Sequence, residues 1–169
     1  MKAGKTAGAA AGGSTPATVA LAAAKVPFTV HLYDHDPGAA SFGLEAAHAL
    51  GLPAELVYKT LLVSLDGELV VGIVPVSTQL DLKAIAAVLG GKKATMAEPT
   101  RAEKATGYVV GGISPIGQRR GHRTVLDASA KAFAMILVSG GKRGMDLGIA
   151  PADLVQLTDA TTAQISRRR

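Results

Sequence analysis

The sequence predicts one α/β domain built on a mixed, strongly curved sheet. Its 169 residues suit a single domain that buries a real hydrophobic core. Helix-like and strand-like segments follow one another without the strict βαβ alternation of a parallel sheet. The pair Asp66-Gly67 between two apolar runs is a strong signal for a two-residue β-hairpin. Neither an internal repeat nor a second domain is expected.

Helices are predicted where a capping residue or a proline precedes apolar residues at helical spacing. Their predicted starts, in chain order, are Thr15-Pro16, Ser41, Asp81, Glu98-Pro99 and Pro151. Glycine after an apolar run predicts a helix end. Such ends are expected at Gly51, Gly90-Gly91 and Gly107, and the last helix is expected to run through Leu157.

Strands are predicted where β-branched, aromatic and other apolar residues form short runs. In chain order these runs are residues 28–33, 60–65, 68–76, 108–110, 123–127, 132–139 and 145–149. The last two are separated by a glycine-rich turn at 140–144. Because one hairpin is clear and the other connections vary, the sheet is expected to mix parallel and antiparallel strands.

The net charge of +5 is concentrated at the two ends of the chain. Residues 1–14 contain two lysines and no acid, and residues 167–169 are three arginines. The remaining 13 basic and 13 acidic residues lie in 15–166, so their charges sum to zero. This balance excludes a uniformly basic protein that coats nucleic acid. We expect a disordered tail over 1–14, the functional domain over 15–166 and a basic tail over 167–169.

The composition excludes several classes of protein and site. With no cysteine, the chain has no disulfide framework, zinc-thiolate site or cysteine nucleophile. His31 and His35 lie where a strand gives way to a loop, so they lose the spacing of a metal-binding pair, and neither a metal nor a cofactor is expected. There is no long apolar run and no leucine-rich leader, so no membrane association and a cytoplasmic location are expected.

Three loops are the places where function is most expected. Residues 111–117 are glycine-rich, and their backbone N–H groups suit a carbonyl oxygen or a phosphate. Residues 118–123 are densely basic and favour contacts with backbone phosphates. Residues 139–144 combine a serine with two cations. For each loop, a plain turn or a solvated surface stays open as the alternative.

Two single residues, Lys59 and Asp146, are also candidates for a functional role. Lys59 precedes an apolar strand, so its ammonium group either reaches solvent or lies in a polar pocket. Asp146 is the only acid between Asp127 and Asp153, and it suits a hydrogen bond from an amine. It suits equally well a role in balancing the charge of Arg143.

Taken in order, these segments resemble the YbaK-type Cys-tRNA(Pro) deacylases, which belong to the editing domains associated with prolyl-tRNA synthetase. The resemblance covers roughly residues 15–168. The motifs that carry it most specifically are Lys59-Thr60-Leu61, Gly111-Gly112-Ile113-Ser114-Pro115 and Ser139-Gly140-Gly141-Lys142-Arg143-Gly144. The fold that it implies is a mixed, barrel-like sheet flanked by helices. The implied substrate is cysteine wrongly esterified to proline tRNA, held by its 3′ end and acceptor stem, with prolyl-tRNA synthetase as partner.

The resemblance also implies the residues of the site. The substrate pocket would contain Tyr33, Phe42, Lys59, Thr60, Gly111, Ser114, Ser139 and Asp146. Lys59 matches the lysine on which the family relies most, and N–H groups near Gly111 and Gly112 are expected to stabilise an oxyanion. The expected tRNA contacts are Arg119, Arg120, Arg123, Lys142 and Arg143.

The implied chemistry takes its thiol from the substrate. The cysteinyl side chain, with an ordinary pKa near ~8.5, would attack its own carbonyl and leave as a cyclic thioester, and attack by water is the alternative route. Three other functions stay open on the sequence. They are an editor of another ester such as Ala-tRNA(Pro), a non-catalytic module that binds the tRNA end or the synthetase, and an α/β protein for a general small ligand.

Overall fold

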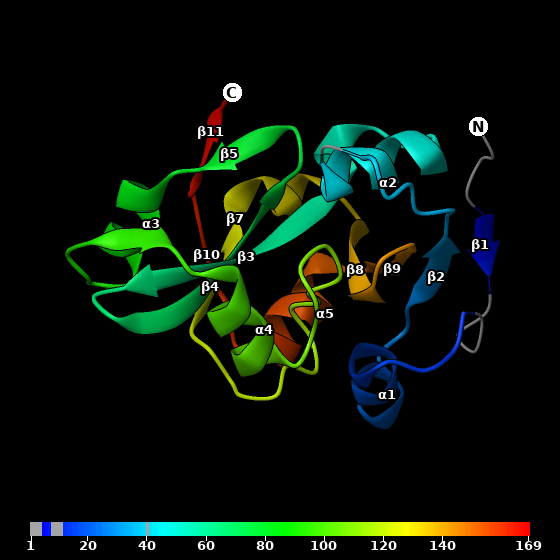
Figure 1. Cartoon of the computed structure of the whole chain (residues 1–169), viewed down its shortest axis with the longest axis horizontal. Coiled ribbons are helices and arrows are strands. Elements are labelled where there is room, and N and C mark those ends of the chain that lie inside the picture. Colours follow the sequence, from blue (N-terminus) through cyan, green and yellow to red (C-terminus); the bar gives the residue numbers. More distant parts are fainter. Residues whose placement is uncertain (1–4, 8–11, 40) are drawn as a thin grey trace.

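The computed structural model describes residues 5–7, 12–39 and 41–169, and these form a mixed α/β fold (Figure 1). The α-helices are α1 (Pro16–Ala23), α2 (Phe42–Leu50), α3 (Leu82–Val88), α4 (Pro99–Thr106) and α5 (Pro151–Thr158), and the 3₁₀ turns are η1 (Ala54–Leu56) and η2 (Ala128–Ala132). The strands are β1 (Lys5–Ala7), β2 (Thr29–Leu32), β3 (Tyr58–Leu65), β4 (Glu68–Pro75), β5 (Thr78–Leu80), β6 (Ala94–Met96), β7 (Thr124–Asp127), β8 (Ile136–Lys142), β9 (Met145–Ile149), β10 (Thr161–Ala163) and β11 (Ser166–Arg168).

These strands form three sheets. Their orders are β1-β2-β9-β8, β10-β7-β4-β3-β6 and β11-β5. Strand β7 runs parallel to both β4 and β10, whereas the other pairs are antiparallel, so the predicted mixed pairing is confirmed. The first two sheets meet at one isolated bridge between Val57 and Leu137, and in the described part of the chain they do not close into a barrel. The barrel-like expectation is therefore corrected to separate sheets.

Local signals in the sequence predicted most of the helix ends. The side chains of Thr15, Ser41 and Asp81 each accept a hydrogen bond from the backbone of the helix that follows, as N-caps do. Gly51 ends α2 with φ 66° in the left-handed region. The predicted hairpin joins β3 to β4, with Asp66 and Gly67 both at positive φ, as a type I′ turn requires.

Other predicted elements differ from the structure. Residues 108–110 form a turn rather than a strand, because Tyr108 is buried and its hydroxyl donates a 2.7 Å hydrogen bond to the carbonyl of Ile116. Strand β8 begins only at Ile136, since η2 occupies residues 128–132, and it then continues through the expected glycine turn to Lys142 with a shift of register. The sequence analysis missed β5, β6 and β10, which have three residues each.

The two expected tails also contain strands. Lys5–Ala7 pairs with β2, whereas residues 1–4 and 8–11 lie outside the described residues, so the disordered tail stays a prediction there. At the other end, Ser166–Arg168 pairs with β5, which makes it part of the fold and not a free basic tail. Backbone pairing at an open sheet edge explains both differences, because it needs no apolar side chains.

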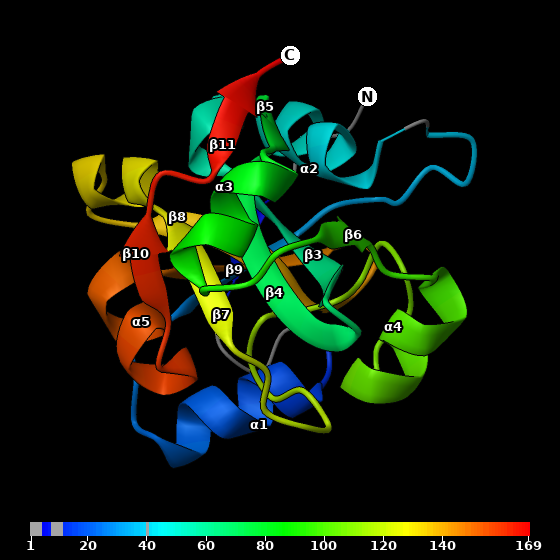
Figure 2. The same cartoon turned by 90° about the vertical axis from the view of Figure 1, so that its left-hand side faces the viewer.

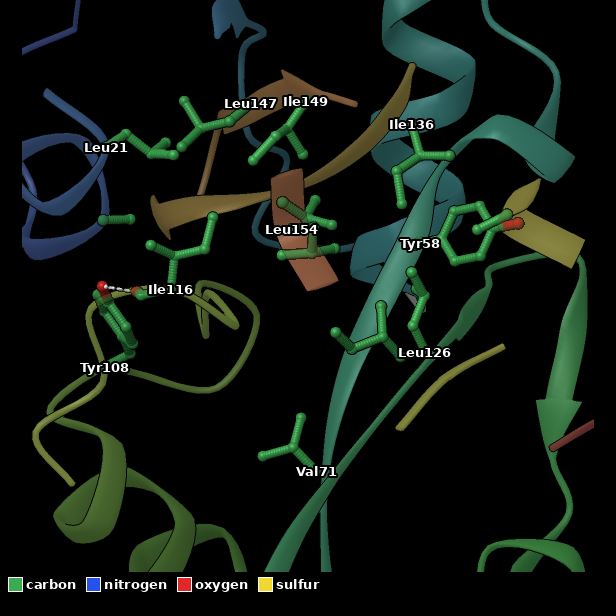
Figure 3. Packing of buried hydrophobic residues seen from close by; sticks show 14 of the residues in the cluster. Leu21, Tyr58, Val71, Tyr108, Ile116, Leu126, Ile136, Leu147, Ile149 and Leu154 are labelled. Carbon is green, nitrogen blue, oxygen red and sulfur yellow. Dashed lines mark hydrogen bonds between the residues drawn. The ribbon is translucent and has the colours of Figure 1, made fainter. Parts of the chain in front are cut away.

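The main core lies between the two larger sheets (Figures 1 and 3). Leu147 and Ile149 of the first sheet face Tyr58 and Leu126 of the second across an apolar interior, with Leu154 of α5 between them. Figure 2 shows the second sheet from its outer side, with α3 and α4 beside it. Among the described residues, no helix has the length and apolar character needed to cross a bilayer.

Asp127, which is fully buried, ties the C-terminal segment to the second sheet. Its carboxylate accepts 2.9 Å hydrogen bonds from the backbone N–H groups of Ile165 and Ser166. It also accepts a 2.5 Å hydrogen bond from the hydroxyl of Ser129, which is bonded in turn to the hydroxyl of Tyr58. This network holds the start of β11 close to β3 and β5.

We expect Asp127→Ala to destabilise the fold by about 3 kcal/mol, because it leaves buried N–H donors without an acceptor. Urea unfolding measures this loss. The exposed Asp34 provides the matched control, since Asp34→Ala is expected to change the free energy of unfolding by less than about 0.5 kcal/mol. Equal stability of the two variants would contradict the role given to the buried carboxylate.

Candidate active site

A cavity of about 390 Å³ opens between α2, β3, the β8–β9 hairpin and the segment from β6 to the 110–113 loop. We call it the central cavity. It is lined by seven of the nine predicted pocket residues, Tyr33, Phe42, Lys59, Thr60, Gly111, Ser139 and Asp146. Its volume lies in the range typical of small-ligand sites. Residues more than a hundred positions apart in the sequence thus contribute to one site.

Gly112 and Ser114 do not line the central cavity. The N–H group of Gly112 donates a 2.8 Å hydrogen bond to the carbonyl of Val109, so it is not available to a substrate. Ser114 is fully buried, and its hydroxyl accepts a hydrogen bond from the N–H group of Ile116. Both residues shape the glycine-rich loop, and the expected contact of either one with the substrate stays a prediction.

Lys59 is a half-buried residue of β3 on the wall of the central cavity. Its Nζ donates a 2.9 Å hydrogen bond to the carbonyl of Thr78 in β5. Burial lowers the pKa of Lys59, and the nearby positive charge of Arg169 lowers it further. Arg169 itself donates a 3.1 Å hydrogen bond to the carbonyl of Val76. Two cations thus lie close to this end of the cavity, which favours an anionic or electron-rich ligand.

Thr60, the next residue of β3, also lines the central cavity. Its hydroxyl is buried and has no hydrogen-bond partner among the described residues. Buried hydroxyl groups are normally paired, so an unpaired one on a cavity wall is suited to a ligand.

Asp146 lies at the middle of the first sheet, where β9 runs between β2 and β8. It faces His31 on one side and Ser139 on the other, and directly opposed residues of antiparallel strands share one face. Its carboxyl group is almost completely buried, and this burial raises the pKa of Asp146 to about 7. Burial also lowers the pKa of His31. The cavity therefore contains a carboxyl group that changes its charge close to neutral pH.

Aromatic residues, Tyr33 and Phe42 among them, form another part of the cavity wall. The Phe42 ring stacks on His35 with centroids 5.7 Å apart, and the Arg143 guanidinium lies 5.0 Å from its centroid. Gly111 adopts φ 89°, and a Cβ atom there would lie 2.7 Å from the Phe42 ring, so only glycine fits. Burial raises the pKa of Tyr33, as does the charge of Asp146, so the Tyr33 hydroxyl stays protonated at neutral pH.

Two charged side chains, those of Glu103 and Arg143, bind the backbone of Val110, the residue before Gly111. The carboxylate of Glu103 accepts a 2.8 Å hydrogen bond from the N–H group of Val110. Arg143 donates two hydrogen bonds to the carbonyl of Val110, at 3.0 and 2.7 Å. The sequence analysis missed Glu103, because its link to the loop joins residues that no periodic pattern relates. Arg143 was predicted to contact tRNA, and the structure places it at the rim of the cavity.

The other predicted tRNA-contacting residues lie in different places. Lys142 donates a hydrogen bond to the carbonyl of Gly12. Arg119 packs beside Gly107 at the end of α4 and donates to the carbonyl of Lys104. Arg120 and Arg123 line a second cavity on the other side of α4. The five cations therefore do not form one continuous patch with the central cavity.

The cavity also has an apolar wall that the sequence analysis did not single out. It includes Val57, Leu62, Met96, Ala97 and Pro99. Apolar residues in strands and at helix starts look the same whether they face a core or a cavity, so the sequence carried no signal for this wall. Within the described ranges, no group of three or more His, Asp or Glu side chains is placed to hold a metal ion.

Comparison with known proteins identifies relatives of most of the chain. The chain matches the family model of the aminoacyl-tRNA editing domain over residues 36–157. A protein of Enterococcus faecalis, provisionally named Cys-tRNA(Pro)/Cys-tRNA(Cys) deacylase EbsC, is 37% identical over 123 residues, which are 72% of this chain and 75% of that protein. The proline–tRNA ligase of Nitratidesulfovibrio vulgaris is 33% identical over 130 residues, which are 76% of this chain but 21% of the ligase.

The fold matches solved structures as well. One of them, provisionally described as a trans-editing enzyme for prolyl-tRNA synthetase, superposes with a TM-score of 0.76 at 22% identity. The match covers 91% of this chain and 98% of that protein. The predicted fold class is thereby confirmed.

Proposed function

Because the chain belongs to the aminoacyl-tRNA editing domain family, we propose that it is a trans-acting deacylase that removes cysteine esterified to tRNA(Pro). The observation that carries this proposal is the central cavity, in which Lys59 and the buried Asp146 line the same small space. The name of the E. faecalis relative also includes Cys-tRNA(Cys), and we include that ester in the proposal. We expect the reaction to take place in the cytoplasm, where charged tRNA is used.

The central cavity supplies groups for each part of an aminoacyl ester. The ionised carboxylate of Asp146 is suited to accept hydrogen bonds from the α-ammonium group of the amino acid. Lys59 is suited to the terminal ribose, to its phosphate or to the charge that develops on the carbonyl oxygen. Gly111, whose backbone offers an N–H donor, and Thr60, with its unpaired hydroxyl, also line the cavity.

The proposed chemistry uses the thiol of the substrate. Its sulfur attacks the carbonyl carbon of the same cysteinyl group, so that a carbon–sulfur bond forms and the bond to the ribose oxygen breaks. The thiol proton passes to the leaving ribose oxygen, and the amino acid departs as a cyclic thioester. A pocket separates similar small side chains by only about 1–3 kcal/mol, so a requirement for a thiol adds selectivity that shape alone does not provide.

Esters of one tRNA(Pro) with cysteine, serine, alanine and S-methylcysteine provide the test of this route. We expect single-turnover deacylation of the cysteine ester to exceed the others by at least roughly a hundredfold, because serine is a poor nucleophile and the other two lack one. S-methylcysteine is the sharpest comparison, since it keeps the sulfur, adds one methyl group and has no thiol to attack the carbonyl. Similar rates for all four esters would rule out thiol assistance and favour attack by water. A preference for alanine would favour the editor of Ala-tRNA(Pro).

Prolyl-tRNA synthetase is the partner that we propose for presenting the substrate. The matching region is a small part of the N. vulgaris ligase, and the present domain would act on the same tRNA in trans. The charge balance of residues 15–166 supports a role for the synthetase in presenting the tRNA, because a neutral domain gains limited affinity for tRNA by itself.

A further inference from the structure

A groove lined by basic residues lies on the face of α4 opposite to the central cavity. Its volume is about 660 Å³, and we call it the basic groove. It is bounded by α4, the start of β4 and the loop before β7, which lie side by side in Figure 2. Its charged lining residues are Glu68, Arg101, Lys104, Arg120 and Arg123. Four cations against one carboxylate give the lining a net charge of +3.

The single carboxylate of the groove is already neutralised. Glu68 forms a 2.6 Å ion pair with Arg123, whose guanidinium also donates to the carbonyl of Leu89. Burial and the charge of Arg120 lower the pKa of His122, which favours the neutral form of this groove residue. The positive charge that remains for a ligand therefore comes from Arg101, Lys104 and Arg120.

One of these cations is held in place. Arg101 donates a 2.6 Å hydrogen bond to the carbonyl of Gly67 and a 3.3 Å hydrogen bond to the hydroxyl of Ser64, both in or next to the β3–β4 hairpin. A guanidinium fixed in this way loses less conformational entropy when it binds a phosphate. The hairpin that the sequence predicted thus orients an arginine that the sequence analysis did not select.

The linings of the basic groove and the central cavity come nearest in sequence at the first turn of α4. Pro99 lines the central cavity and Thr100, the next residue, lines the groove. An α-helix with its side chains is about 10–12 Å thick, which roughly three stacked nucleotides span at about 3.4 Å each. A chain whose last nucleotide enters the central cavity therefore reaches the groove with phosphates a few nucleotides from its end.

We infer that the basic groove binds RNA backbone phosphates a few nucleotides before the 3′ end whose ester occupies the central cavity. This inference rests on the proposed deacylase function for the identity of the polymer. It divides the predicted tRNA contacts by position, with Arg120 in the groove and Arg143 at the rim of the cavity. The inference also adds Arg101 and Lys104 to the predicted tRNA contacts.

The salt dependence of RNA binding tests the inference. The probe is an uncharged RNA minihelix with a single-stranded 3′ end, and its affinity is measured by fluorescence anisotropy from low to moderate salt. Each phosphate contact contributes about 0.7–0.9 to the slope of log affinity against log salt, so Lys104→Gln/Arg120→Gln is expected to reduce the magnitude of that slope by roughly 1.4 to 1.8. Affinity at low salt is expected to fall several-fold. Melting temperatures establish that the variant is folded.

The matched control is Lys83→Gln/Lys131→Gln, which removes the same charge from exposed sites in α3 and η2. Its slope is expected to equal that of the unaltered protein. An unchanged slope in the groove variant, or an equal reduction in the control, overturns the inference. Because the RNA carries no ester, binding is independent of the chemistry. A protein that binds through the groove but cleaves no ester would instead contradict the proposed deacylase function.

Discussion

Lys59→Ala is expected to lower single-turnover deacylation of Cys-tRNA(Pro) by roughly 10²–10³-fold, the loss found when one preorganised charge-stabilising donor is removed. The fold is expected to survive, because the hydrogen bond from Nζ of Lys59 ends on one backbone carbonyl, that of Thr78. Removing a half-buried cation beside Arg169 also relieves repulsion between like charges. Thermal unfolding and deacylation rates, measured on the same samples, separate the two effects.

Lys83→Ala provides the control for this prediction, because Lys83 is an exposed lysine of α3 that does not line the central cavity. It is expected to cleave the ester at the rate of the unaltered protein. Near-normal turnover by Lys59→Ala would remove the lysine from the mechanism. Binding of the terminal phosphate, or stabilisation of the charge on the carbonyl oxygen, would then have to be assigned to other groups.

Asp146→Asn is expected to stabilise the fold at alkaline pH while it lowers activity. Burial raises the pKa of Asp146 to about 7 in the folded protein, whereas an aspartate in an unfolded chain titrates near ~3.9. Between these values the folded state holds a proton that the unfolded state has lost, so stability falls as the pH rises from about 4 to about 7. The asparagine side chain does not titrate, and the variant escapes this loss.

The stability difference between Asp146→Asn and the unaltered protein is therefore expected to grow by about 2 to 4 kcal/mol between pH 4 and pH 8. Urea unfolding at several pH values measures it, with Asp34→Asn, at an exposed position, as the control. A difference that does not change with pH would contradict the burial of an uncompensated carboxyl group. In activity assays, kcat/KM of the unaltered protein is expected to rise through pH 7, and that of Asp146→Asn to be roughly 10- to 100-fold lower.

The local parts of the fold were predictable because their signals lie within a few residues of one another. Thr15, Ser41 and Asp81 cap the helices that they were expected to cap, and Asp66-Gly67 forms the expected hairpin. The short strands β5, β6, β10 and β11 were not predictable in this way. Three residues are too few for an alternating pattern, and these strands depend on pairing with distant partners.

The candidate site was predictable where a charged residue stands among apolar residues or glycines in the sequence. A lysine before an apolar strand and an isolated acid in a glycine-rich region pointed to Lys59 and Asp146, and the resemblance supplied their common purpose. Gly112 and Ser114 were expected in the pocket from the glycine-rich motif, but neither lines the cavity, because both residues build the turn of that loop. The support of the loop by Glu103 and the basic groove beside α4 follow from the tertiary arrangement alone.

The hydrogen-bond network of Asp127 determines when the site can be completed during protein synthesis. It anchors the segment that continues into β11, which pairs with β5, and β5 carries the carbonyl group that accepts the hydrogen bond of Lys59. Residues 165–168 leave the ribosome after every residue that lines the central cavity. A nascent chain therefore carries all of its pocket side chains before their scaffold is complete. We expect it to become competent for editing only when this final strand has emerged and docked.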